Sequence, residues 1–328
     1  MSKGETGATK NFPLYDDLPV KPGAPKGSAW GVFGDRDELG CLNFLTPTQV
    51  LRAVRLVRRG AVFPLNLPLD EPQPPLFGRG LPEHQLLASH SNLFRDDYLN
   101  NLWPQSSSQW DGLRHIRHPQ DGFYNGTRDE EIISGGGRLG IERAAQQGIC
   151  GRGVLVDVER WRKEDGRPIN QQATELITPD MLEECLEKQG VQLEGGDILL
   201  VHTGWLRWYR EEATAEQKQA ISGKATAASL KAPGLGPTEE IAAFLWDLRV
   251  TAVASDNATL EAWPPQTGSG FLHAKLIPHL GMLLGELWYL QELAADCAED
   301  GAYEFLLVSV PINIRGGVAS PANAVAIK

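Results

Sequence analysis

Paired or clustered cysteines are missing from this sequence. Its four cysteines lie at positions 41, 150, 185 and 297, with no spacing typical of a disulfide framework or a zinc knot. Long apolar runs are missing too, so we predict no membrane-spanning helix. The first ten residues lack the apolar core of a signal peptide. Together these absences favour a cytoplasmic protein with reduced thiols and no membrane partner.

Basic residues are fewer than acidic residues. The chain has 31 Lys and Arg against 42 Asp and Glu, a net charge of −11, which argues against a nucleic-acid partner. It contains no Gly-x-Ser-x-Gly elbow, no Walker sequence and no glycine-rich phosphate fingerprint. The sequence therefore gives no sign of a serine hydrolase of that type or of a nucleotide-binding protein.

Hydrophobic residues make up 41% of the sequence, which is enough for a large core. The sequence also contains 35 glycines and 22 prolines. This composition predicts many turns and long loops rather than a helical bundle. We interpret residues 1–29 as an extended N-terminal arm and 30–328 as one domain. Helices alternate with strands, which indicates an α/β protein. We predict helices at 49–59, 141–147, 178–189 and 239–248, strands at 61–69, 85–92, 105–115, 151–158, 197–202, 250–257 and 303–310, and a polar lid candidate at 211–230.

One short stretch concentrates residues that could carry chemistry. Gln105, Gln109, Asp111 and His115 have the same parity, so on an extended strand their side chains would leave one face. A core strand would instead show Val or Ile at those positions. The pattern fits a strand that lines a polar pocket, with or without a metal. It fits a solvent-facing edge strand followed by a turn equally well.

Three further groups could join this pocket. His273 and Glu286 have ligand-type side chains in apolar surroundings, where a core histidine or a partnered core acid is the alternative. His202 and Asp256 lie at the carboxyl ends of two predicted strands, where pockets often form. Trp110 and Trp205 fit an aromatic pocket wall or the core. Carboxylate, imidazole and amide ligands together suit Zn or Mn better than Ca or Mg.

These residues carry a resemblance to the putative cyclase family, which includes bacterial kynurenine formamidase and isatin hydrolase. The similarity runs from about residue 30 to the C-terminus. It rests on the segments 37–43, 109–115, 151–157, 202–205, 255–257 and 285–288. The best-studied members carry the motif His-x-Gly-Thr-His-x-Asp-x-Pro-x-His. The resemblance implies a swivelling β/β/α domain, a mixed sheet with flanking helices, and hydrolysis of a small amide, lactam, lactone or ester.

Laid on that motif, Asp111 matches the metal-binding aspartate and His115 the last histidine, which serves the chemistry in the family. His273 and Glu286 match the downstream metal ligands. Gln105 and Gln109 stand where the family has two metal-binding histidines, and a carboxamide is a poorer zinc ligand than imidazole. We therefore expect one divalent metal, Mn or Zn, held by Asp111, His273 and Glu286 with Gln109 as a weak ligand, or no metal at all.

We expect His115 to act as the general base. The substrate, a small molecule, would contact Trp110, Gln105, His202, Trp205 and Asp256, and the protein would be a homo-oligomer, a dimer or a tetramer. Two alternatives remain open from the sequence. The chain could be a catalytically silent small-molecule-binding protein that has lost its metal through the two glutamines. It could also be a metal-independent lyase or isomerase that uses Asp111 and His115 as an acid–base pair.

Overall fold

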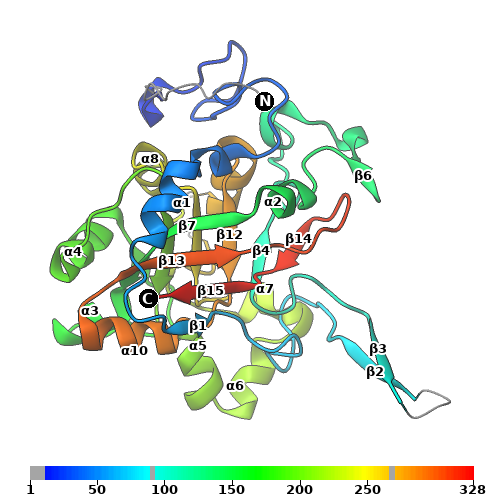
Figure 1. Ribbon diagram of the computed structural model, residues 1–328, viewed down its shortest axis with the longest axis vertical. Helices are drawn as coiled ribbons and strands as arrows, with labels where there is room; N and C mark the ends of the chain where they lie inside the picture. Colours follow the sequence, from blue (N-terminus) through cyan, green and yellow to red (C-terminus); the bar gives the residue numbers. More distant parts are fainter. Residues whose placement is uncertain (1–11, 89–92, 266–269) are drawn as a thin grey trace.

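A nine-stranded mixed sheet forms the centre of the protein (Figure 1). The computed structural model describes residues 12–88, 93–265 and 270–328. Four parallel strands, β7 (Ile149–Asp157), β9 (Ile198–His202), β11 (Ala252–Ser255) and β12 (Leu283–Glu286), lie side by side in that order. Antiparallel strands extend the sheet on both sides: β13 (Glu304–Ser309), β15 (Ala324–Ile327) and β1 (Val62–Pro64) beyond β7, and β4 (Gln109–Asp111) and β14 (Ala319–Pro321) beyond β12.

The sheet curls so that its two ends approach each other. β15 is second and β14 ninth in the strand order, a separation of seven strand spacings, or roughly 34 Å if the sheet were flat. Yet only Ala322 and Asn323 lie between these two strands, and a chain of that length reaches about 10 Å. Trp110 on β4 also donates a hydrogen bond from Nε1 to Ser309 Oγ on β13, 2.8 Å away. The protein is thus an α/β protein with a half-barrel sheet.

Helices flank this sheet, and their ends follow capping rules. α4 (Pro179–Gln189) begins with Thr178, whose Oγ1 accepts from Met181 N, and ends at Gly190 with φ 68°. α8 (Glu239–Asp247) has the same threonine cap at Thr238. The other helices are α1 (Pro47–Val54), α2 (Glu142–Gln147), α3 (Val158–Glu164), α5 (Trp205–Arg207), α6 (Ala215–Ala220), α7 (Thr226–Ser229), α9 (Leu272–Lys275) and α10 (Gln291–Asp300). No helix among the described residues has both the length and the apolar character needed to cross a membrane.

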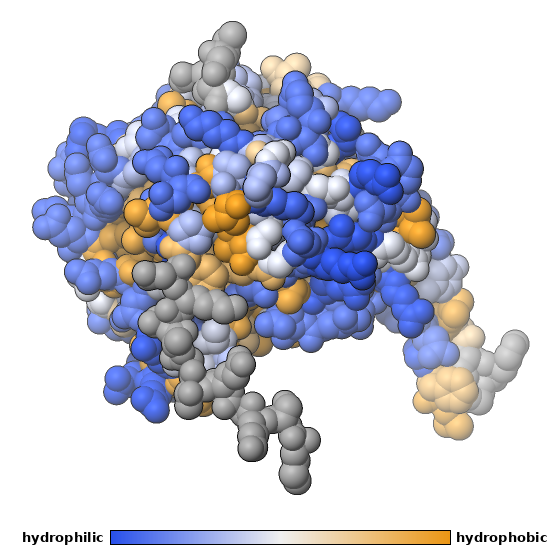
Figure 2. Space-filling model, turned by 90° about the horizontal axis from the view of Figure 1, so that it is seen from above, coloured by the Kyte–Doolittle hydropathy of each residue, from blue (hydrophilic) through white to orange (hydrophobic). Residues whose placement is uncertain are grey.

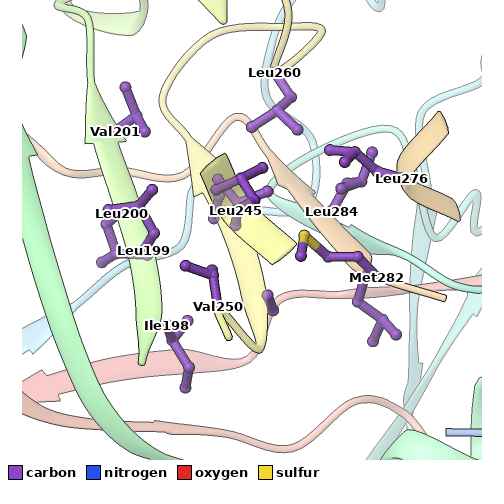
Figure 3. Packing of buried hydrophobic residues seen from close by; sticks show 14 of the residues in the cluster. Ile198, Leu199, Leu200, Val201, Leu245, Val250, Leu260, Leu276, Met282 and Leu284 are labelled. Atoms are coloured by element: carbon purple, nitrogen blue, oxygen red, sulfur yellow. The ribbon is translucent and has the colours of Figure 1, made fainter. Parts of the chain in front are cut away.

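The main core lies between the parallel strands and the helices beside them. Figure 3 shows side chains of this core on β9 (Leu199 and Val201), on α8 (Leu245) and on β12 (Leu284). All four side chains are fully buried. Because parallel strands are covered on both faces, they read as nearly continuous apolar runs, which is why the sequence predicted β7, β9 and β11.

Several predicted elements need correction. The helix predicted to Arg59 ends at Val54, and of the strand predicted at 61–69 only Val62–Pro64 forms. The strand predicted at 105–115 is confined to Gln109–Asp111. Helices α3, α9 and α10 and strands β12 and β14 were not predicted.

The strand predicted at 85–92 is part of a hairpin. β2 (Glu83–Ala88) pairs with β3 (Arg95–Asn100), and the hairpin stands away from the body of the protein (Figure 1). Residues 89–92 lie outside the described part of the chain. Viewed from above, hydrophobic residues gather near the end of this hairpin (Figure 2). Leu93 and Phe94, which precede β3, are 86% and 62% exposed.

The described part of the predicted N-terminal arm packs onto the domain. Phe12 O accepts from Arg249 Nη2 at 2.8 Å, and Pro13 O accepts from Trp246 Nε1 at 2.9 Å. Further on, Ala29 N donates to His279 O at 2.9 Å. Residues 1–11 of the predicted arm lie outside the described residues.

Candidate metal centre and active site

Strands β4 and β12 place three candidate residues on one face of the sheet. Their antiparallel register pairs Gln109 with Glu286 and Asp111 with Leu284, and directly paired residues project to the same face. Gln109 Nε2 accordingly donates to Glu286 Oε2 at 2.6 Å. Because β12 lies next to β11 in a parallel arrangement, these side chains sit near the carboxyl ends of the parallel strands, where pockets form in α/β proteins.

His273 reaches the same point from α9. Its Nε2 lies 3.0 Å from Glu286 Oε1 and 3.8 Å from Asp111 Oδ2. On the other side of the ring, Nδ1 lies 2.6 Å from Glu261 Oε1. The Glu261 carboxylate also accepts from the backbone N–H groups of Leu272 and His273, at 2.8 and 3.1 Å. Glu261 therefore fixes both the start of the helix and the direction of the imidazole, as acids behind metal-binding histidines do.

The residues present fit a divalent cation. Asp111, His273 and Glu286 each offer a ligand atom within 4.8 Å of the others, and the three residues are 0%, 3% and 4% exposed. Among the described residues, Asp111 Oδ2 is buried without a hydrogen-bond partner, a costly state for a carboxylate oxygen. With Glu261, three buried carboxylates surround one imidazole, and a cation among them would satisfy both the free oxygen and the excess negative charge.

The pKa values of His273 and Glu286 reflect this close packing of buried carboxylates around one imidazole. Burial by itself would lower the pKa of His273, but hydrogen bonds to Glu261 and Glu286 outweigh it and raise the pKa to about 10. The pKa of Glu286 is raised, first by burial and then by the nearby charge of Asp111. Protons thus take up part of the negative charge of this cluster, and a bound cation would compete with them.

Gln109 is oriented by Arg79. Arg79 Nη1 donates to Gln109 Oε1 at 3.3 Å, and it also contacts the backbone oxygen of Gln105. The amide nitrogen of Gln109 therefore faces the two acids, at 2.6 Å from Glu286 Oε2 and 3.5 Å from Asp111 Oδ1. In this orientation Gln109 donates to the carboxylates instead of offering its oxygen to a metal.

Gln105 and His115 complete the group, although neither lies on a strand. Gln105 Nε2 contacts Asp111 Oδ1 and lies 3.0 Å from His115 Nδ1. His115 Nε2 is 3.8 Å from Asp111 Oδ2, and its side chain is 22% exposed. Burial lowers the pKa of His115, against the opposing effect of Asp111. At neutral pH the ring is therefore uncharged, as a general base must be.

The remaining predicted site residues lie elsewhere. Trp110 occupies the opposite face of β4, fully buried against Trp288 at a centroid distance of 4.7 Å. Trp205 is fully buried and stacks on Tyr209 at 5.2 Å. Both tryptophans therefore pack in the hydrophobic core of this structure. A core position was one of the two interpretations that the sequence allowed for them.

His202 and Asp256 belong to a neighbouring polar group. His202 Nδ1 lies 2.8 Å from Asp157 Oδ1, and its Nε2 is 3.8 Å from Asp256 Oδ2. Asp256 accepts from the backbone of Thr203 and Gly204. Within the described residues, no hydrogen bond joins the His202 and Asp256 side chains to Asp111 or His115. A substrate contact at either residue stays a prediction.

Sequence reasoning missed two residues of this site, Glu261 and Arg79. Glu261 is an acid between Leu260 and Ala262, the same signal that drew attention to Glu286, but the sequence gives no reason to connect it to His273. Arg79 lies in a proline- and glycine-rich segment with no periodicity.

Comparison with known proteins supports the predicted resemblance. A family model described as "Putative cyclase" matches residues 55–262, more than half of the chain. A solved structure described as a novel cyclase shares 33% identity and a TM-score of 0.80, and the match covers 92% of this chain and 97% of that one. None of the curated proteins compared matches the chain.

More distant solved structures share the fold. Isatin hydrolase A from Labrenzia aggregata, bound to benzyl benzoate, aligns with a TM-score of 0.57 at 15% identity, over 85% of this chain and 97% of that one. Isatin hydrolase A from Ralstonia solanacearum gives 0.55 at 15%, over 87% and 98%. The family match and the related cyclase structure together show that this chain belongs to the putative cyclase family.

Proposed function

We propose that this protein is a metal-dependent hydrolase that cleaves a C–N or C–O bond in a small amide, lactam, lactone or ester. The observation that carries the proposal is the buried group of Asp111, His273 and Glu286. Asp111 Oδ2, which has no hydrogen-bond partner within the described ranges, lies 3.8 Å from Nε2 of both His115 and His273. Membership of the cyclase family and the fold shared with isatin hydrolases support it. We assign the domain to the swivelling β/β/α type, acting as a homo-oligomer on a small-molecule substrate.

Asp111, His273 and Glu286 would hold the cation, which we propose to be Zn or Mn. A cation there would polarise the substrate carbonyl and acidify a water molecule. Glu261 holds the ring of His273 in place through Nδ1. Gln109 donates to Glu286 and to Asp111, which keeps both carboxylates turned toward the centre of the group.

His115 would move the proton. It would take a proton from the attacking water and return it to the leaving nitrogen or oxygen. In the arrangement seen, Gln105 Nε2 faces Nδ1, so the neutral ring carries its hydrogen on Nε2. Accepting a proton at Nε2 requires the other tautomer, which forms when the carboxamide of Gln105 turns its oxygen toward Nδ1. Gln105 would thus set the tautomer of the base.

Metal analysis and a substrate panel test this proposal. We expect purified protein to hydrolyse at least one of an N-formyl aromatic amine, a fused lactam, a lactone or an aryl ester. Chelation should abolish that hydrolysis, and Zn²⁺ or Mn²⁺ should restore it. Asp111→Asn, His273→Ala and Glu286→Gln should each remove the metal bound at this site. Turnover that survives chelation, or full metal occupancy in all three variants, would overturn the assignment.

The second interpretation, a silent binding protein, rests on Gln105 and Gln109. Metal-free protein that binds panel compounds without turning them over, even after metal is added, would support it. The same measurements therefore separate the two functions.

A further inference from the structure

A second group of metal-ligand type lies apart from the Asp111 cluster. His118 Nδ1 is 2.7 Å from Asp121 Oδ2, and His279 Nε2 is 2.9 Å from the same oxygen. The two imidazole rings lie 4.5 Å apart, centroid to centroid. All three ligand atoms fall within 4.8 Å of one another. The side chains are 24%, 26% and 14% exposed for His118, Asp121 and His279, so the group is partly open to solvent.

Backbone hydrogen bonds fix the segments that carry these three side chains. His118 and Gly122 exchange two backbone hydrogen bonds, of 2.9 and 3.1 Å, which close the loop that carries Asp121. The Asp121 N–H also lies 3.3 Å from His118 Nδ1. His279 sits in the π-helical segment η7 (Leu276–Leu280), and its backbone oxygen accepts from Ala29. The ligand atoms are thus positioned by segments far apart in the sequence before any ligand binds.

The three ligand atoms converge on one point, close to the separation that a metal needs. Metal–nitrogen and metal–oxygen bonds of about 2.0–2.2 Å in a tetrahedral zinc site place two ligand atoms about 3.4 Å apart. The two N···O distances here, 2.7 and 2.9 Å, are hydrogen-bond distances, so zinc would replace these hydrogen bonds and spread the ligand atoms by about half an ångström. Two imidazoles and one carboxylate favour a divalent transition metal over Ca²⁺ or Mg²⁺, and three protein ligands leave room for water or another ligand.

We propose that His118, Asp121 and His279 form a second binding site, for a divalent transition metal such as Zn²⁺. The site shares no residue with the proposed hydrolase centre and does not depend on it. Lys275 is the nearby cation that opposes metal binding, but its ammonium is paired with Glu239. The competing interpretation is purely structural: Asp121 would bridge two histidines and join the 118–122 loop to η7 without a metal.

Zinc titration of chelator-stripped full-length protein separates these interpretations. We expect the wild-type protein to bind two Zn²⁺ per chain, and Asp121→Asn and His279→Gln to bind one. Asp111→Asn should also bind one, and the Asp111→Asn/Asp121→Asn double variant none. His84→Gln is the matched control, because His84 pairs with Asp97 at 2.8 Å on the hairpin and belongs to no three-residue ligand group in the described part of the chain. It should still bind two.

Co²⁺ absorption in the visible range gives a second readout, with one of two spectral components lost in His279→Gln. Circular dichroism establishes which variants are folded, and His118→Gln replaces any that is not. Folded variants of this group that keep the wild-type zinc stoichiometry and affinity would overturn the proposal. If the hydrolase proposal alone fails, Asp111→Asn leaves the number of bound Zn²⁺ ions unchanged, while Asp121→Asn still removes one.

Discussion

Glu261→Gln gives the sharpest test of how the metal centre is built. Glu261 is fully buried, and its carboxylate receives the His273 ring at 2.6 Å as well as two backbone N–H groups. Glutamine keeps the size of the side chain but removes the charge and one acceptor oxygen. We therefore expect the imidazole to be held less firmly and to be a weaker donor to a metal.

The magnitude follows from comparable metal sites. Loss of a partner behind a metal-binding histidine costs roughly 10- to 100-fold in metal affinity, or about 1.4–2.8 kcal/mol. Stability should fall as well, by about 1–3 kcal/mol, because one buried backbone N–H at the start of α9 loses its acceptor. The two effects have separate causes and need separate measurements.

Competition with a chromophoric chelator in the Asp121→Asn background, which lacks the second proposed zinc site, measures the zinc affinity of this centre, and urea unfolding of the stripped protein measures stability. Glu142→Gln is the control, since Glu142 is also buried and accepts from Gly316 N at 3.0 Å. That variant should lose stability while its zinc affinity stays within about twofold of wild type. Glu261→Gln protein that is folded and binds zinc as tightly as wild type would refute the reasoning.

Three other outcomes follow from the structure. His115→Asn should keep its metal while kcat falls roughly 10²- to 10⁴-fold; loss of metal together with rate would instead make His115 a ligand. Gln109→His should tighten zinc binding, because imidazole is a better donor than a carboxamide, and unchanged affinity in the chelator competition would leave residue 109 outside the coordination sphere. Burial raises the pKa of Asp197 from 3.8 to about 6, although Arg152 opposes this. The folded state therefore holds this proton more tightly than the unfolded state, and the resulting stability is full below about pH 4 and lost as pH rises through 6. Relative to Asp197→Asn, wild type should lose up to about 3 kcal/mol between pH 4 and 7, and an equal difference in urea unfolding at both pH values would contradict this.

Residue identity and local sequence pattern determined several strands and helix starts and the residue types of the candidate metal centre. The apolar runs at β7, β9 and β11 predicted buried strands, because a strand covered on both faces has no polar side. Threonine followed by helix-forming residues fixed the starts of α4 and α8 through bonds within four residues. The resemblance selected Asp111, His273 and Glu286, which the fold brings together.

Tertiary structure decided which residues meet and which face they take. Strand parity explains why Gln109 and Asp111 share a face, but the strand is only three residues long. Gln105 and His115 join them through the turns on either side, which a period of two does not describe. Trp110 belongs to the interior of the curled sheet, because the chain between β14 and β15 brings the ends of the sheet together.

The contacts of Glu261 and Arg79 were also decided by the tertiary structure and not by local sequence pattern. Arg79 contacts Gln109 across 30 positions of sequence, and Glu261 approaches His273 across a segment of 12. Neither contact has a periodic signature, because both arise where loops cross the end of the sheet. Residue types determined by themselves what chemistry this chain can perform, whereas the position of each acid, amide and imidazole was decided by the strand pairing and loop packing that brought distant segments to one point.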